Sequence, residues 1–391
     1  MIARNSALAA VKTALEHYPV VTLLGARQVG KTTLARQIAA EVGASGAVPA
    51  VSVHFFDLED PTDLARLAEP KLALDSLSGL VIIDEVQRKP SLFALLRVLA
   101  DRADSPAKFI LLGSASPDIV RGTSETLAGR SAFIDLGGFD LREIPAAQMR
   151  PLWWRGGFPR AFLAASDAAA RDWQENFIRT FLERDIPALG IDVAAPTLRR
   201  FWTMLAHYHG QTWNAAEFAR SLGASEVIAR RYLDILCGAF AVRQLPPWFE
   251  NLGKRQVKSP KVYVRDSGIM HALLRVESFE TLQGHPKLGA SWEGFCVEQL
   301  LSVVGERNAY FWATHAGAEL DLLLLRGEKR IGVEIKYADA PRTTKSMHSA
   351  LADLKLAHLY VVYPGETRFP MTQNITAISL PEMIAEMAQA A

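Results

Sequence analysis

A glycine-rich loop between an apolar run and a helix-forming segment constrains the fold of this chain more than any other feature. Residues 25–32 read Gly-Ala-Arg-Gln-Val-Gly-Lys-Thr, and the apolar run 20–24 precedes them. The pattern G-x-x-x-x-G-K-[ST] between a strand and a helix places backbone N–H groups, a lysine and a hydroxyl around nucleotide phosphates. The loop therefore predicts an α/β fold with a parallel sheet that binds a nucleoside triphosphate.

Each residue type in the loop has a separate predicted task. Gly25 and Gly30 allow unusual backbone angles that turn N–H groups toward the phosphate oxygens. Lys31 supplies a charge at the β- and γ-phosphates, and Thr32 a hydroxyl ligand for Mg²⁺. A helix over 31–40 directs its positive N-terminal end at the anion. We therefore expect ATP and Mg²⁺ as cofactors, with nucleotide contacts from Gly25, Ala26, Arg27, Gln28, Val29, Gly30, Lys31, Thr32 and Thr33.

A second apolar run ends in two carboxylates. Residues 79–83 read Gly-Leu-Val-Ile-Ile, and Asp84 and Glu85 follow them. Such a run fits a parallel strand buried on both faces, and open α/β sheets bind ligands at the carboxyl ends of their strands. Asp84 is predicted to hold Mg²⁺ through water, and Glu85 to orient or deprotonate the water that attacks the γ-phosphate. The pair predicts ATP hydrolysis in addition to binding.

The segments around the remaining strands of this sheet supply candidates for two further roles. Strand-like and helix-like segments alternate over residues 1–150, with strands expected at 20–24, 52–57, 80–84, 108–113 and 132–136. Ser114 or Ser116, at the end of one strand, is the candidate polar sensor beside the Asp84 strand. Arg130 is predicted either to act as an arginine finger on a neighbouring subunit's nucleotide or to form an ordinary ion pair.

Length and composition exclude several classes of protein. The 391 residues are enough for about two to four domains. No apolar run approaches the ~18–20 residues that span a bilayer, and residues 1–6 lack a signal-peptide core. Two cysteines, Cys237 and Cys296, provide no disulfide framework and no zinc spacing. We therefore expect a cytoplasmic protein.

The net charge of +1 conceals a basic segment. Residues 195–275 contain twelve Lys or Arg and five Asp or Glu, which leaves this segment at +7 and the rest of the chain at −6. Helix-forming runs at 197–208, 214–223 and 226–240, and two strand-like runs at 241–245 and 261–264, predict a winged helix. An anionic partner, with DNA first, is expected.

In a winged helix of this kind, the third helix enters the major groove and the wing contacts phosphates. Arg230 and Arg231 are therefore expected near DNA, while the wing's phosphate contacts are expected from Lys254, Arg255, Lys258 and Lys261. The alternative is that this segment contacts a protein or packs between domains.

The last part of the chain, 276–391, contains a second group of chemically competent residues. Two strands at 318–325 and 330–336, joined by a tight turn, bring Asp321, Glu334 and Lys336 to one end of a hairpin. Two carboxylates can hold a Mg²⁺ that activates water against a phosphodiester, and Glu293 on a helix adds a third carboxylate. The alternative is an amphipathic hairpin with solvated charges.

Taken together, these motifs resemble a large family of bacterial and archaeal AAA+-type ATPases. Its members carry a C-terminal domain of unknown function with a winged helix and a restriction-endonuclease-like fold. The resemblance rests on residues 25–32, 80–85, 113–114 and 127–130 and on Asp321…Glu334-Ile-Lys336. It implies ATP hydrolysis, and a nuclease-like domain akin to Holliday-junction resolvases, whose site is degraded in many relatives.

The resulting prediction has four domains. A P-loop ATPase domain spans 1–150, a helical lid or connector 151–194, the winged helix 195–275 and a restriction-endonuclease-like α/β domain 276–391. The leading hypothesis is an ATPase coupled to DNA binding, acting on branched DNA, with a metal-dependent nuclease site. The alternative is a regulatory ATPase whose C-terminal domains bind a protein and whose nuclease-like domain is inactive. An arginine finger at Arg130 would require a homo-oligomer.

Overall fold

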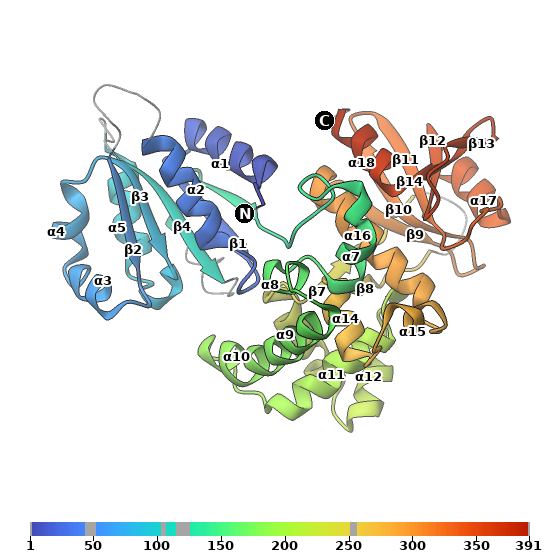
Figure 1. The fold of residues 1–391 in the computed structure, drawn as a ribbon, viewed down its shortest axis with the longest axis horizontal. Coiled ribbons are helices and arrows are strands. Elements are labelled where there is room, and N and C mark those ends of the chain that lie inside the picture. Colours follow the sequence, from blue (N-terminus) through green and yellow to red (C-terminus); the bar gives the residue numbers. More distant parts are fainter. Residues whose placement is uncertain (1, 44–51, 103–106, 115–125, 251–255, 390–391) are drawn as a thin grey trace. The chain divides into compact units, whose positions relative to one another are not determined.

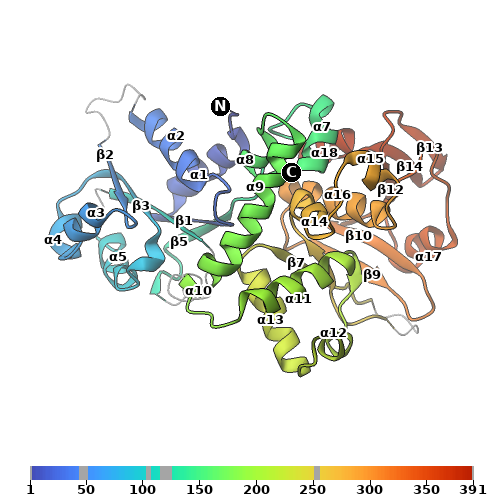
Figure 2. The same ribbon diagram turned by 60° about the horizontal axis from the view of Figure 1, so that its bottom comes forward.

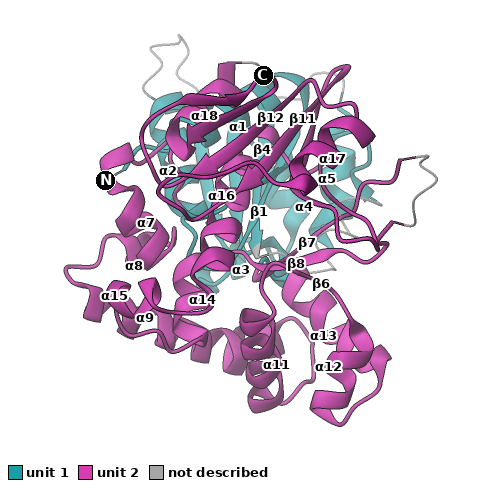
Figure 3. Ribbon diagram, turned by 90° about the vertical axis from the view of Figure 1, so that its right-hand side faces the viewer, with its two compact units in different colours: residues 1–138, 238–240 teal, residues 139–237, 241–391 magenta. Residues whose placement is uncertain are grey.

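The computed structural model describes residues 2–43, 52–102, 107–114, 126–250 and 256–389, with the side chain of Ser114 excepted. The chain divides into two compact units (Figure 3). Unit 1 contains residues 1–138 and 238–240, and unit 2 contains residues 139–237 and 241–391. Unit 2 therefore includes most of three of the predicted domains, and the finer domain boundaries stay predictions.

Unit 1 is built on a five-stranded parallel sheet in the order β2-β3-β4-β1-β5 (Figure 1). Each strand begins and ends within one residue of its predicted bounds, which confirms the parallel α/β fold. The strands are β1 Val20–Gly25, β2 Val53–Asp57, β3 Gly79–Asp84, β4 Ala107–Ser114 and β5 Ser131–Asp135.

Helices cover both faces of this sheet. Val81 and Ile83 of β3 share a core cluster with Leu92 and Leu96 of α5, whereas α2 contacts the sheet without joining that cluster. Both faces of β3 are buried because helices pack on each, which explains its unbroken apolar run. The helices are α1 Asn5–His17, α2 Lys31–Gly43, α3 Pro61–Arg66, α4 Pro70–Asp75 and α5 Leu92–Ala100.

Unit 2 begins with helices and continues into a small mixed segment (Figure 2). The first helices are α7 Met149–Arg155, α8 Pro159–Phe162, α9 Asp167–Thr180 and α10 Ile186–Ala188. Then follow α11 Ala195–His207, β6 Gln211–Thr212, α12 Ala215–Leu222, α13 Glu226–Gly238, β7 Val242–Leu245 and β8 Lys261–Val264. The last three strands form an antiparallel sheet in the order β6-β8-β7.

Local side chains and a glycine mark both ends of α12 and the start of α13, within one residue of the predicted bounds. The Asn214 side chain accepts from the backbone N–H of Glu217, and Ser225 accepts from that of Ile228, so each residue caps the helix that follows it. Gly223 ends α12 with φ +66°, in the left-handed region that glycine adopts without strain. Local capping residues thus fix the turn between α12 and α13.

The rest of unit 2 is a six-stranded mixed sheet in the order β13-β14-β12-β11-β10-β9. Helices α16 and α18 contact each other and the sheet, while α17 packs on the cluster formed by Trp312, Leu320, Leu323 and their neighbours. The strands are β9 Ala309–Ala313, β10 Glu319–Arg326, β11 Lys329–Ile335, β12 His358–Tyr363, β13 Phe369–Thr372 and β14 Ile375–Ser379. The helices are α14 Ser267–Leu273, α15 Phe279–Gln283, α16 Leu288–Val304, α17 Lys345–Asp353 and α18 Leu380–Gln389.

Between β7 and β8, residues 246–248 and 256–257 contact the edge of this larger sheet. The backbone N–H of Trp248 donates to the carbonyl of Phe311 at 2.7 Å, and that of Val257 to the carbonyl of Ala313 at 3.0 Å. Both acceptors lie on β9, the edge strand of the sheet. The two arms of the predicted wing therefore cover a sheet edge, which leaves less of the hairpin available to a ligand.

No helix in the described part of the chain is long and apolar enough to cross a membrane.

Candidate functional site

The glycine-rich loop joins β1 to α2 at the carboxyl edge of the unit 1 sheet. Gly30 has φ +102° and Gln28 φ +63°, so two loop residues have left-handed backbone. Gly25 has no positive φ; instead, a Cβ there would lie 2.3 Å from the carbonyl oxygen of Leu136. The predicted reason for Gly25 is therefore wrong, because the close approach of a neighbouring strand end requires this glycine.

Lys31 is the first residue of α2, and its side chain is buried, with 6% exposed. Its ammonium donates to the carbonyl oxygens of Gly25 and Ala26, both at 3.0 Å. Burial lowers the pKa of Lys31, an effect that Glu85 and Asp84 partly oppose. Among the described residues, no carboxylate lies within ion-pair distance of this ammonium. In the part of the chain that the structure describes, it is a buried cation that forms no ion pair.

Thr32 and Asp84 meet at the end of β3, as the motif predicts. The Thr32 hydroxyl donates to Asp84 Oδ2 at 2.6 Å, and the backbone N–H of Glu85 donates to Asp84 Oδ1 at 2.9 Å. Burial raises the pKa of Asp84, and the Thr32 hydrogen bond lowers it. A hydroxyl and a carboxylate are oxygen donors of the kind that Mg²⁺ prefers, so this pair fits the metal.

Glu85 has a left-handed backbone, with φ +53° and ψ +43°. This conformation is uncommon for a non-glycine residue and concentrates at functional sites. Its carboxylate accepts from the Gln87 side-chain amide, and burial raises its pKa. A carboxylate with a raised pKa is a better proton acceptor at neutral pH than an ordinary glutamate.

A buried arginine outside the motif supports the loop. The Arg4 guanidinium donates to the carbonyl oxygens of Val29, Gly137 and Gly138 at 3.2, 3.1 and 2.9 Å. It therefore ties the phosphate loop to the segment after β5. Arg4 has no signal in the sequence, because no local motif surrounds it and its three acceptors lie far away in sequence. Arg27, at the loop, pairs with Glu59 at 2.5 Å.

The remaining unit 1 candidates have mixed outcomes. Ser114 ends β4, in register with Gly25 of β1, and Ser116 lies outside the described residues. Arg130 forms a two-point ion pair with Asp101, at 2.5 and 2.8 Å, on a partly exposed surface. The ion-pair alternative thus describes Arg130 in this structure, and its action as a finger stays a proposal.

The nuclease-like candidates of unit 2 lie together. Glu293 comes from α16, Asp321 from β10, Glu334 from β11 and Lys336 from just after β11. Leu320 and Leu323 both join the core around a β-bulge, so Asp321 lies on the other face of the strand. We call Glu293, Asp321 and Glu334, with Glu319 at the exposed rim, the carboxylate cluster.

A lysine from the winged-helix segment lies inside this cluster. The Lys261 ammonium is 3.0 Å from Glu293 and 3.3 Å from Asp321, and it also pairs with Glu319. Its side chain is 3% exposed. The prediction that Lys261 contacts DNA phosphates is therefore wrong: β8 directs it into unit 2, where three carboxylates neutralise it.

Other charges of the basic segment are also used internally. Arg243 is buried between Glu298, at 2.8 Å, and Glu306, at 2.5 Å; Arg265 pairs with both of these glutamates. Lys254 and Arg255 lie outside the described residues. The exposed cations that remain are Arg200, Arg220, Arg230, Arg231, Lys258 and Arg275. A charge count along the sequence overstated the basic surface, because the neutralising acids come from elsewhere in unit 2.

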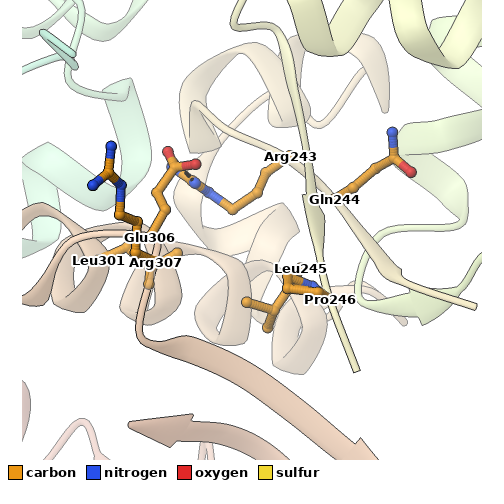
Figure 4. Close-up of a pocket in the computed structure, with 7 residues that line it drawn as sticks. All are labelled: Arg243, Gln244, Leu245, Pro246, Leu301, Glu306 and Arg307. Carbon is orange, nitrogen blue, oxygen red and sulfur yellow. Dashed lines mark ion pairs between the residues drawn. The ribbon is translucent and has the colours of Figure 1, made fainter. Parts of the chain in front are cut away.

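A hollow of about 200 Å³ lies between β7 and the end of α16 (Figure 4). Arg243 and Glu306, which line it, form the ion pair already described. Leu245 and Leu301 contribute apolar wall. The buried arginine is neutralised by protein carboxylates, and Arg307, an exposed residue, adds a further charged side chain to the lining.

Comparisons with known proteins bear on both units. Residues 17–145 match the AAA domain family, and residues 146–280 and 288–383 match two domains of unknown function, DUF8612 and DUF4143. Proteins of Mycobacterium tuberculosis and Mycobacterium bovis, both titled uncharacterized, are 48% identical over 384 residues, which is 98% of this chain and 85% of each relative. The chain belongs to this family of AAA+-type P-loop ATPases.

Solved structures similar to this AAA+-type ATPase are more distant. The Walker-type ATPase PABY2304 of Pyrococcus abyssi is 16% identical, with a TM-score of 0.49, over 70% of this chain and 96% of that chain. The ORC2 protein of Aeropyrum pernix, solved with ADPNP and ADP, is 16% identical, with a TM-score of 0.36, over 62% and 87%.

Proposed function

We propose that this ATPase binds ATP at the loop 25–33 and hydrolyses it with Glu85 as the base. The carrying observation is the contact between Thr32 and Asp84 at 2.6 Å, which joins the end of the loop to the end of β3. It brings the two oxygen donors of a metal–nucleotide site to the same sheet edge as Lys31. This contact supports a single site made of Lys31 and Thr32 and, 52 positions further along the chain, of Asp84 and Glu85.

The residues divide the work of hydrolysis between them. The Lys31 ammonium would exchange its two carbonyl acceptors for phosphate oxygens, whose charge compensates the cost of its burial. Thr32 and Asp84 would hold Mg²⁺, which neutralises charge on the phosphates when bound. The Glu85 carboxylate would orient the attacking water and accept its proton.

Coupling to DNA is the second part of the proposal. The order helix–strand–helix–helix–strand–strand from α11 to β8 supports a winged helix. Most residues in the first half of α13 are exposed to solvent. Arg230 and Arg231 are exposed there, beside Val227, which is 75% exposed. Arginine can hydrogen-bond to guanine or to phosphate, and an apolar side chain can contact the thymine methyl group. We propose that α13 rather than the wing makes the main contact.

A protein partner is the competing function, and the same helix favours it. Val227 and Ile228 are adjacent exposed apolar residues, and much of the basic segment's charge is neutralised internally. An apolar patch of this kind fits a protein surface as well as a base edge. The two functions therefore predict different responses of the ATPase to nucleic acid.

The deciding experiment measures ATP turnover with no DNA and with duplex, single-stranded and four-way-junction DNA. Stimulation that falls as salt is raised supports coupling to DNA, because salt weakens phosphate contacts. Turnover that no DNA changes supports the protein-partner function. If no ATP is hydrolysed under any condition, the proposed catalytic role of Glu85 is wrong.

We also propose that Arg130 acts in trans in a homo-oligomer. To do so it would have to leave Asp101, and an exposed ion pair of this kind costs little to break. Asp101→Ala should then leave ATP turnover unchanged or raise it, while Arg130→Ala should lower it. Equal turnover in both variants and the unmodified chain would leave Arg130 as a surface ion pair.

A further inference from the structure

We propose that Lys261 takes the place of a divalent cation in the carboxylate cluster, so that this chain's C-terminal domain binds no catalytic metal and cuts no DNA. The proposal concerns the restriction-endonuclease-like fold inferred from the sequence, and it holds whether or not ATP is hydrolysed. It replaces the predicted metal site of Glu293, Asp321 and Glu334 with an internal ion-pair network.

The position of the ammonium carries the argument. Lys261 contacts Glu293 at 3.0 Å and Asp321 at 3.3 Å, which are two of the three predicted metal ligands. Lys261 also forms an ion pair with Glu319 at the exposed rim of the carboxylate cluster. The ring of Phe311 lies 5.8 Å from the ammonium and adds a further contact that favours a cation. A second cation on the same oxygens would meet a buried positive charge at short range.

Both ligands accept a further hydrogen bond, Asp321 on its second oxygen and Glu293 on the same oxygen that Lys261 contacts. Asp321 Oδ2 accepts from the backbone N–H of Ile335 at 2.9 Å, and the Tyr263 hydroxyl donates to Glu293 Oε1 at 2.6 Å. Both Lys261 and Tyr263 come from β8, so one strand of the winged-helix segment occupies the cluster. Within the described ranges, no three acidic, His or Cys side chains have a geometry that fits a metal ion.

Glu334 shows that the cluster retains the chemistry of a metal site. Its Oε1 pairs with Lys336 at 2.7 Å, but its Oε2 is buried and has no hydrogen-bond partner among the described residues. A buried carboxylate oxygen without a partner is costly, and a bound cation would satisfy it. Removing the Lys261 charge should therefore let a divalent ion enter between Asp321 and Glu334.

The network also gives the cluster a different task. Since β8 belongs to the winged-helix segment and β10 to the C-terminal sheet, the Lys261 ion pairs fasten these two parts of unit 2 together. The carboxylates that would hold a metal in a nuclease here bind Lys261, and this holds the winged-helix segment and the C-terminal sheet in one orientation. A change that opens the site should therefore also loosen unit 2.

The test counts Mn²⁺ bound to the full chain by electron paramagnetic resonance, without nucleotide. Every arm carries Asp84→Asn, which removes the carboxylate assigned to Mg²⁺ in unit 1. The arms compare the unmodified cluster, Lys261→Met, Asp321→Asn alone, and Lys261→Met with Asp321→Asn. Lys258→Met is an exposed control from the same segment. Circular dichroism checks folding; if Lys261→Met does not fold, Lys261→Gln, which keeps a donor to Glu293, replaces it.

We expect Lys261→Met to bind about one Mn²⁺ more per chain than the unmodified cluster, and the added Asp321→Asn to remove it. Lys258→Met should bind as the unmodified cluster does. The proposal is overturned if the folded Lys261 variant gains no ion, or if Asp321→Asn alone lowers Mn²⁺ binding. DNA cleavage by the unmodified chain with Mn²⁺ that is lost in Glu334→Ala would overturn it equally.

Discussion

Lys31 and Lys261 are both buried lysines, yet their surroundings are opposite. Lys31 donates to two backbone carbonyls and has no described carboxylate at ion-pair distance, and burial lowers its pKa. Burial also acts to lower the pKa of Lys261, but Glu293, Tyr263, Asp321 and Glu319 more than offset this and raise it well above the usual value. One charge is left for an anionic ligand, and the other is fully neutralised by the protein.

This difference separates a binding site from a closed network. Burying a charge without a counter-ion is costly, and proteins retain such a charge where a ligand supplies the missing partner. A buried charge with several partners stabilises one arrangement of the chain and has little attraction left for a ligand. On this criterion the unit 1 site is open to an anion and the unit 2 cluster is closed to a cation.

The largest effect is expected when the charge of Lys31 is removed. Lys31→Ala should weaken ATP binding roughly 100-fold or more, because a buried charge-assisted contact to phosphate is lost. Fluorescent-nucleotide titration measures the effect. Lys12→Ala is the control, since Lys12 is an exposed lysine of unit 1 that pairs with Glu41. Normal ATP affinity in Lys31→Ala would mean that this lysine is as closed to ligands as Lys261.

Glu85 tests whether the open site also performs chemistry. Glu85→Gln should keep ATP affinity within about threefold and lower turnover roughly 100-fold or more, because an amide cannot accept the proton of water. Steady-state phosphate release and nucleotide titration give the two values. Glu69→Gln, at an exposed position of unit 1, controls for the loss of a negative charge. Unchanged turnover in Glu85→Gln would assign the base elsewhere.

The contrast also explains what the sequence could predict. The loop, Asp84 and Glu85 were found because a contiguous motif and a strand end place them by local rules, and the strand bounds of unit 1 followed in the same way. The predicted starts of α12 and α13 agree with the structure to within one residue for the same reason, because Asn214 and Ser225 cap these helices locally. Each of these features depends on neighbours within a few residues.

Features that depend on distant partners were missed or misread. Lys261 reads as part of a basic wing until β8 is placed beside Asp321, sixty positions away. Arg4 has no local signature, because its acceptors, Val29, Gly137 and Gly138, meet only in the folded unit. Gly25 was identified correctly, but for a backbone angle rather than for the approach of Leu136. Long-range packing decides these cases, and one sequence does not contain it.

His209 tests how firmly the unit 2 network excludes further positive charge. It is buried beside the ring of Tyr263, and its Nδ1 accepts the backbone N–H of Val264 at 3.0 Å. Burial lowers the pKa of His209 to about 3. Below about pH 6.5 the unfolded chain therefore binds a proton that the folded chain does not. Stability is lost as the pH falls from about 6.5 toward the folded pKa of about 3.

Replacing His209 by Asn keeps an acceptor near Nδ1 and removes the titration. Between pH 7 and pH 5 the unmodified chain should lose about 2 kcal/mol of stability relative to His209→Asn, from the unfolded-state protonation alone. Urea unfolding at both pH values, followed on unit 2 tryptophans, measures the difference. A stability difference between the two proteins that does not change with pH would mean that folded His209 accepts a proton readily.

The smallest expected effect concerns the exposed arginines that the unit 2 network leaves unused. Because internal ion pairs neutralise Arg243 and Lys261, DNA binding would have to depend on exposed side chains such as Arg231 of α13. Arg231→Ala should weaken duplex binding about 10-fold and reduce the salt slope by about one. Arg179→Ala is the matched control, because Arg179 is also exposed on a helix but lies outside the basic segment. Equal losses of duplex affinity in both variants would indicate that DNA binds to exposed positive charge without a defined site. A loss confined to Arg231→Ala would place the contact on α13 and would agree with a structural role for Lys261.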